Sequence, residues 1–86
     1  MPRFMITRTL PPLSPEQLDA VRLTSTNVCS TLGISWVRSH LTPDGKHSFC
    51  EYDAPDEEAI REHSRLSGIP FDAITPLGLE LGPSWA

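Results

Sequence analysis

The spacing of apolar residues along the chain predicts four strands. Apolar and polar residues alternate over 3–10, which is typical of a strand with one buried face, and two prolines follow it. The apolar positions of this strand are Phe4, Ile6 and Leu10. Residues 34–42, 47–53 and 71–77 have strand-forming composition between turn signals and are predicted to form the other three strands.

The segment between the first two predicted strands carries strong helix signals. Ser14-Pro15-Glu16-Gln17 combines an N-cap serine, a proline at the first helical position and a glutamine that can close a capping box. Gly33 is the expected stop. The residues that fall on one face of this helix are Leu18, Val21, Ser25, Val28, Cys29 and Leu32.

A second helix is predicted after the third strand. It opens within 54–58, where three acidic residues favour the positive end of the helix dipole, and it ends before Gly68. Asp53 and Asp56 are both candidates for the N-cap, and the sequence leaves this choice open.

The resulting order, βαββαβ, predicts an α+β fold of the ferredoxin-like type over residues 1–77. Its four-stranded antiparallel sheet would carry both helices on one face. The other face is then left to water, a ligand or a second sheet, as in a dimeric α+β barrel. The tail, 78–86, contains Leu79, Leu81 and Trp85 and is a candidate to pack on the partner subunit.

The hairpin between the second and third strands decides which side chains share that open face. Read as a three-residue turn with a glycine bulge, Pro43-Asp44-Gly45 places Arg38 opposite Cys50 and Trp36 opposite Tyr52. The predicted open face then holds Trp36, Arg38, His40, Cys50 and Tyr52, and the face under the helices holds Val37, Leu41 and Phe49. A two-residue turn would instead put Phe49 and Glu51 beside Arg38 and His40. We favour the first register because it sorts the apolar residues better.

The predicted open face has the residues of a metal or ligand site. A guanidinium near Cys50 favours its thiolate, and His40, diagonal to Cys50, offers a nitrogen ligand. Thiolate and imidazole suit nickel, zinc or copper better than magnesium or calcium. Trp36, Arg38, His40 and Tyr52 would form the walls of the pocket. The competing interpretation is a mixed dimer interface with the two large aromatic residues as anchors.

His63 is the third candidate ligand. It lies on the inward stripe of the second predicted helix, where a histidine is either a hydrogen-bonded core residue or a donor at the edge of a cavity.

Composition narrows the possible partners and location. A chain of 86 residues has room for one domain with a thin core, which a partner subunit commonly stabilises. The formal charge of −4 and the scattered basic residues argue against nucleic acid as a partner.

No apolar run approaches the roughly 20 residues of a membrane span. The first ten residues lack a secretory layout, and the two cysteines lack C-x-x-C spacing, so a cytoplasmic protein with reduced thiols is expected.

Three motifs resemble a bacterial family of small nickel-binding-protein-like proteins, otherwise classified as a domain of unknown function. They are the stretch CEYDAPDEEAIREH over 50–63, Trp36-Val37-Arg38-Ser39 before the hairpin, and Gly68-Ile69-Pro70 after the second helix. The resemblance implies a ferredoxin-like fold, a dimer whose sheets face each other and, for at least one member, nickel binding.

Cys50 and His63 match the central motif of that family. The chain departs from the usual pattern at two positions, with His40 in place of tyrosine and Asp53 in place of glutamate. The histidine at position 40 therefore either adds a ligand or adapts the pocket to another function.

The leading hypothesis is a dimeric cytoplasmic protein that binds nickel or another divalent transition metal through Cys50 with His40 or His63. The alternative is a small-molecule enzyme (a cyclase, isomerase or cofactor-free oxygenase) with a pocket in a dimeric α+β barrel. A purely structural or regulatory dimer is the third possibility. The sequence leaves open whether the protein is an enzyme.

Overall fold

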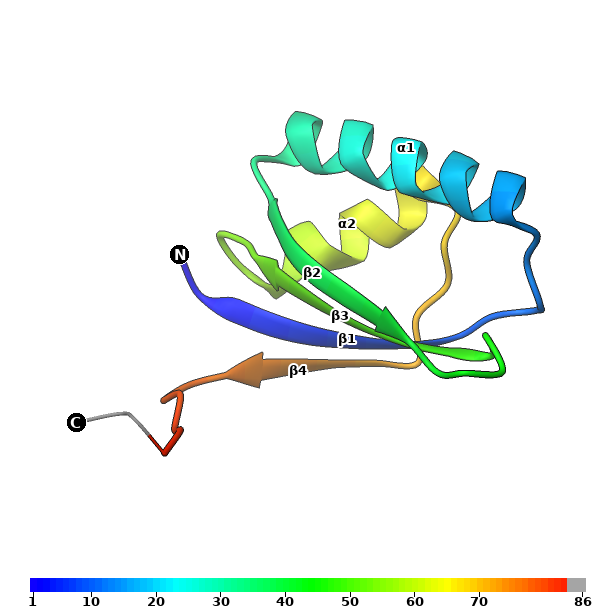
Figure 1. The fold of residues 1–86 in the computed structure, drawn as a ribbon. Coiled ribbons are helices and arrows are strands. Elements are labelled where there is room, and N and C mark those ends of the chain that lie inside the picture. Colours follow the sequence, from blue (N-terminus) through cyan, green and yellow to red (C-terminus); the bar gives the residue numbers. More distant parts are fainter. Residues whose placement is uncertain (84–86) are drawn as a thin grey trace.

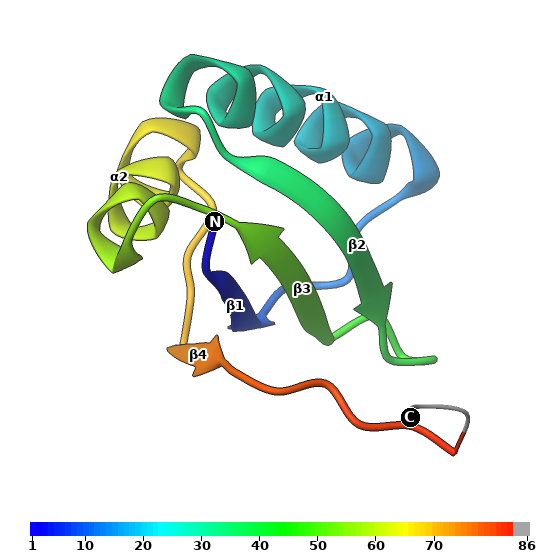
Figure 2. The same ribbon diagram turned by 90° about the vertical axis from the view of Figure 1, so that its left-hand side faces the viewer.

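The computed structural model of the chain describes residues 1–83 and has the predicted ferredoxin-like α+β fold (Figure 1). Its elements are β1 (Arg3–Thr9), α1 (Pro15–Leu32), β2 (Ser35–Leu41), β3 (His47–Asp53), α2 (Glu57–Ser67) and β4 (Ala73–Leu77). The strands form one antiparallel sheet in the order β2-β3-β1-β4. Both helices cover the same face, with α1 on the β2 side and α2 on the β4 side, and the opposite face is bare (Figure 2).

The helix ends form as the sequence predicts. The Ser14 hydroxyl accepts from the Gln17 amide at 3.1 Å, and the Gln17 side chain accepts from the Ser14 amide at 2.8 Å, so the capping box is closed. Gly33 ends α1 in the left-handed region with φ of 68°. Asp56, not Asp53, caps α2, because its carboxylate accepts from the Ala59 amide at 2.9 Å.

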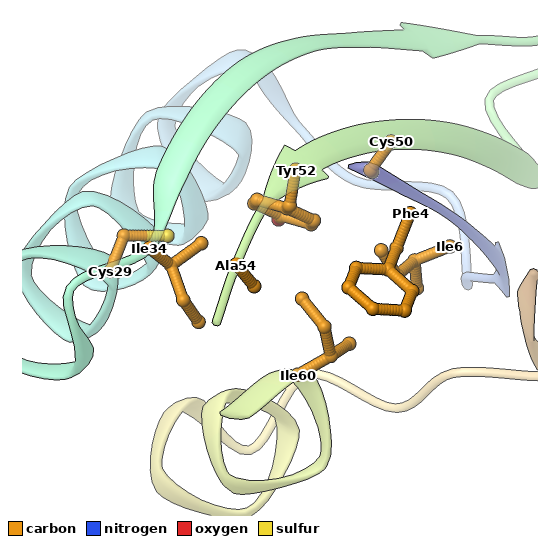
Figure 3. Close-up of a cluster of buried hydrophobic side chains, with 8 residues drawn as sticks. All are labelled: Phe4, Ile6, Cys29, Ile34, Cys50, Tyr52, Ala54 and Ile60. Carbon is orange, nitrogen blue, oxygen red and sulfur yellow. The ribbon is translucent and has the colours of Figure 1, made fainter. Parts of the chain in front are cut away.

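The core lies between the helices and the two central strands (Figure 3). Its buried members are Phe4, Ile6, Cys29, Ile34, Cys50, Tyr52, Ala54 and Ile60. Ile6 and Ile60 are the largest apolar side chains that are almost fully buried, and they come from the sheet and from α2. Cys29 packs here as a free thiol, as expected for a small apolar residue on the inner face of α1.

The register of the β2–β3 hairpin is not the favoured one but puts Phe49 and Glu51 beside His40 and Arg38, as in the alternative. Gly45 has the expected left-handed conformation, with φ of 73°, but Thr42 pairs with His47, so the turn is one residue longer than expected. A β-bulge at Val37 removes this offset, and Trp36 then pairs with Tyr52 as predicted. The predicted pairing of Arg38 with Cys50 is wrong, because Arg38 lies opposite Glu51.

The predicted division of β3 between the two faces is also wrong. Cys50 and Tyr52 lie under the helices, while Phe49 lies on the open face with 42% of its surface exposed. The physical reason is that Phe49 shares its face with Glu51 and Asp53, since side chains alternate along a strand. In the opposite register, burial of Phe49 would also bury two carboxylates. The free-energy cost of desolvating them exceeds the gain from burying one phenylalanine.

No helix within residues 1–83 is long and apolar enough to cross a membrane. In the tail, Leu79 and Leu81 are exposed, and Trp85 lies outside the described residues. Packing of the tail on a partner subunit stays a prediction.

Replacing the N-cap of α1 tests this account of the fold. Ser14→Ala removes the hydroxyl that accepts from Gln17, and we expect a loss of about 1 kcal/mol in the free energy of unfolding by urea titration. The matched control is Thr24→Ala, an exposed mid-helix position, where alanine should be neutral or slightly stabilising. Equal unfolding midpoints for Ser14→Ala and the unmodified chain would contradict the capping role.

Candidate functional site

A chain of buried polar side chains joins β3, α1 and α2. Ser25 Oγ lies 2.9 Å from His63 Nε2 and 3.4 Å from the Tyr52 hydroxyl. The Tyr52 and His63 rings are 5.3 Å apart, and all three residues are at most 2% exposed. Ser25 faces inward because it occupies an apolar-stripe position of α1, so it supplies a hydroxyl where the helix would otherwise bury a methyl or methylene group.

Burial keeps the His63 imidazole neutral. Desolvation, aided by the positive charge of Arg8, lowers the pKa of His63 to about 4. Its Nδ1 has no hydrogen-bond partner among residues 1–83. Burial likewise raises the pKa of the Tyr52 hydroxyl, so both groups stay uncharged at neutral pH. His63 is therefore a hydrogen-bonded core residue, which was one of its two predicted roles.

Arg8 is the most deeply buried of the arginine, lysine, aspartate and glutamate residues that the structure describes. It is 3% exposed, and its Nη1 donates to the backbone carbonyls of Ile69 at 3.2 Å and Pro70 at 2.8 Å. These contacts fix the segment between α2 and β4 against β1. Nη2 is buried without a partner, and none of the ion pairs within residues 1–83 includes Arg8.

A pocket of about 260 Å³ opens between α1 and the β2 side of the sheet. Its walls are mainly apolar and include Leu10, Leu18, Val21, Trp36 and Leu41. Its polar lining includes Arg8, Ser25, Ser48 and Tyr52, and the Cys50 side chain also borders it. Arg8 and the inner polar chain therefore meet an apolar space large enough for a small molecule.

The structure separates the residues that the sequence grouped together. Trp36, Cys50 and Tyr52 line the pocket on the helix-covered side, where Trp36 also donates to Ser39 at 2.8 Å. Arg38 and His40 lie on the other side of the sheet, because they pair with the outward residues Glu51 and Phe49. The expectation that all five side chains share one face is therefore wrong.

The three predicted metal ligands are divided in the same way. His63 and Cys50 belong to the buried side and His40 to the open face. Within residues 1–83, no three His, Cys, Asp or Glu side chains gather closely enough to hold a metal ion. Their assignment as ligands stays a prediction, and His40 would have to act apart from the other two.

The open face carries a pair of imidazoles, of which only His40 was predicted to be a ligand. The hairpin register pairs His40 with Phe49 and Thr42 with His47, so His40 and His47 are diagonal neighbours on one face. Such neighbours are roughly 7–8 Å apart between backbones, within reach of long side chains. Both histidines are exposed. The sequence does not show that His47 lies beside His40, because this placement depends on the length of the turn.

The carboxylates of the open face are already engaged with Arg3. Arg3 donates to both Asp53 oxygens at 2.8 and 3.1 Å and lies 3.8 Å from Glu51. This hydrogen-bonded pairing lowers the pKa of Asp53 and occupies its oxygens. The imidazoles of His40 and His47 are therefore better suited than these carboxylates to bind a metal ion on this face.

Comparison with known proteins places the chain in a family. The family model described as "Nickel responsive protein SCO4226-like" matches residues 4–77, nearly the whole folded domain. The chain belongs to the SCO4226-like family. This confirms the family resemblance of the motifs, and the family's description gives its members a connection with nickel.

A solved structure supports the fold of this SCO4226-like chain. The crystal structure of SCO4226 from Streptomyces coelicolor A3(2) superposes with a TM-score of 0.81 at 18% identity, covering 92% of this chain and 99% of that one. At this identity the similarity shows the fold alone. No curated protein matches the chain by sequence.

Sequence reasoning missed Arg8 and gave Ser25 no role. The signal for Arg8 was present, because it continues the two-residue alternation of Phe4 and Ile6 and so belongs to the buried face of β1. Likewise, Ser25 was assigned to the inner face of α1 but not connected with His63.

Neutral burial of His63 predicts a specific loss of stability in acid. In the unfolded chain the imidazole binds a proton below its ordinary pKa of 6.5, whereas in the folded chain it does so only near 4. Stability is therefore intact above pH 6.5 and falls as the pH drops toward 4, by up to about 3 kcal/mol.

This loss is measured by urea unfolding between pH 7 and 4. The unmodified chain should lose stability more steeply than His63→Gln, which cannot take up the proton. His47→Gln, at an exposed position, should follow the unmodified chain. A constant difference between His63→Gln and the unmodified chain across this range would refute the buried neutral state.

Proposed function

We propose that this chain is a nickel-binding homodimer whose metal donors lie on the open face of the sheet. Membership of a nickel-responsive family supports the metal. The observation that carries the location is the exposed pair of His40 and His47 on one side of the hairpin. Imidazole nitrogen is a suitable ligand for nickel.

Two imidazoles make an incomplete site, so the remaining positions would be filled by water or by donors of a second copy. The carboxylates nearest in the sheet are held by Arg3, which makes them poor additional ligands. Cys50 and His63 are the alternative donors, and the two sets lie on opposite faces of the sheet. Substitutions therefore distinguish them.

The open face also supports the dimer. Phe49 and Leu77 expose 42% and 37% of their surfaces there, beside the half-exposed Met5. Exposed apolar side chains on an uncovered sheet are stabilised when a second sheet covers them, and a domain this small gains from that burial. Two copies packed through this face would form the dimeric α+β barrel expected from the sequence.

Nickel binding can be assigned by calorimetric titration of metal-free protein with Ni²⁺, and with Zn²⁺ and Cu²⁺ for comparison. We expect His40→Ala and His47→Ala each to weaken Ni²⁺ binding about tenfold or more, because each removes a donor. Cys50→Ser should leave it unchanged. If only Cys50→Ser or His63→Gln weakens binding, the buried set holds the metal. Ni²⁺ binding no tighter than millimolar would end the nickel proposal.

The dimer is tested by sedimentation of a charged variant. Phe49→Glu adds a carboxylate to the open face, beside Glu51 on the same strand, and we expect it to shift the protein to a monomer. Leu23→Glu, on the exposed side of α1, should remain dimeric. A dimer that persists in Phe49→Glu, or a monomeric unmodified chain, would argue against this interface.

A small-molecule enzyme remains the second candidate, and the pocket beneath α1 favours it. His40 and Arg38, two of the four residues predicted to form the pocket walls, are absent from that pocket, since both lie across the sheet. Any chemistry there would have to use Tyr52, Cys50 or Arg8.

A further inference from the structure

Arg8 is a buried cation without a counter-ion in the part of the chain that the structure describes. Its contacts with Ile69 and Pro70 satisfy only Nη1. Transfer of a charge from water into a protein interior carries a penalty of several kcal/mol unless an opposite charge offsets it. Ser25 and Tyr52 supply dipoles nearby but no negative charge, since both are neutral hydroxyls.

The pocket bordered by Arg8 is suited to an organic ligand. Its apolar walls come from α1, β2 and the segment after β1, and Trp36 forms part of them. A volume of about 260 Å³ holds roughly eight to ten non-hydrogen atoms at the ~30 Å³ that each water takes in the liquid. The pocket is partly open to solvent, so a small molecule can enter without unfolding the chain.

We propose that this pocket binds a small monocarboxylate with an apolar body, whose carboxylate pairs with the Arg8 guanidinium and whose apolar part lies between α1 and Trp36. Arg8 lines the pocket, and its Nη2, which is buried without a partner among residues 1–83, is the donor assigned to the carboxylate; guanidinium–carboxylate pairs are strong because both partners are charged. Ser25, Ser48 and Tyr52 offer further hydroxyls at the polar end.

The positive charge of Arg8 and the apolar walls of the pocket together favour this class of ligand. A cation would be repelled by Arg8. Inorganic phosphate would leave the apolar walls unfilled. A neutral apolar molecule would fill the walls but leave Arg8 unpaired.

Titration of the metal-free full chain tests the proposal, with benzoate as the probe and Trp36 fluorescence as the signal. Trp85→Phe serves as the background, so that Trp36 is the single tryptophan. We expect saturable binding with a dissociation constant below about 1 mM. Benzyl alcohol, which has a similar shape but no charge, should bind at least tenfold more weakly, and benzylamine should not bind.

Two substitutions locate the site. Arg8→Met should abolish benzoate binding. Because Arg8 also holds the segment after α2, its loss could disturb folding, and Val21→Phe provides a second test by filling the pocket without touching Arg8. Leu23→Phe, the matched change on the exposed side of α1, should bind benzoate normally.

The outcomes separate the possible occupants. Equal binding of benzoate and benzyl alcohol would overturn the anion site and leave a purely apolar pocket. No saturable binding of benzoate, or binding unaffected by Val21→Phe, would overturn the proposal. The measurement is made without metal and does not involve His40 or His47, so its failure would leave the nickel proposal standing, and the reverse also holds.

Discussion

The inward alternation of β3 is the constraint on which the rest of the structure depends. Ser48, Cys50, Tyr52 and Ala54 all face the helices. Because side chains alternate with a period of two, this choice sends Phe49 and both carboxylates of the strand to the open face. Pairing with β1 then places Arg8 opposite Ser48 on the buried side. A slip of one residue would exchange the two surfaces and bury Glu51 and Asp53, so the register that protects the core also decides where both candidate sites lie.

The local features of the fold were predictable because their causes are local. The capping box at Ser14 and the stop at Gly33 depend on neighbours within four residues, and the structure confirms both. The hairpin register depends instead on a turn length and a bulge that compensate each other. One extra turn residue places Arg38 and His40 beside Glu51 and Phe49 instead of beside Cys50, and the bulge at Val37 restores the Trp36–Tyr52 pair. The sequence shows neither irregularity, so the prediction was right at one end of the hairpin and wrong at the other.

The composition of the buried side was harder to predict for a different reason. Arg8 and Ser25 lie in phase with apolar residues, yet polar side chains are ordinarily placed outside. What makes Arg8 tolerable inside is the pair of carbonyls at Ile69 and Pro70, more than sixty residues away along the chain. Ser25 is satisfied by Tyr52 and His63, which come from two other elements. These partners become visible only once the topology brings them together.

Two unfavourable features of the folded chain meet at the same place. An apolar-walled pocket lacks the dispersion contacts that a filled core would gain. The Arg8 guanidinium, which has no counter-ion among residues 1–83, retains much of its desolvation penalty. Either defect alone would be a local weakness in a domain of 86 residues with a thin core. A ligand with an apolar body and one negative charge relieves both at once. Such a ligand would bind the folded state only, since the unfolded chain has no pocket, and stability and occupancy of the pocket would therefore rise together.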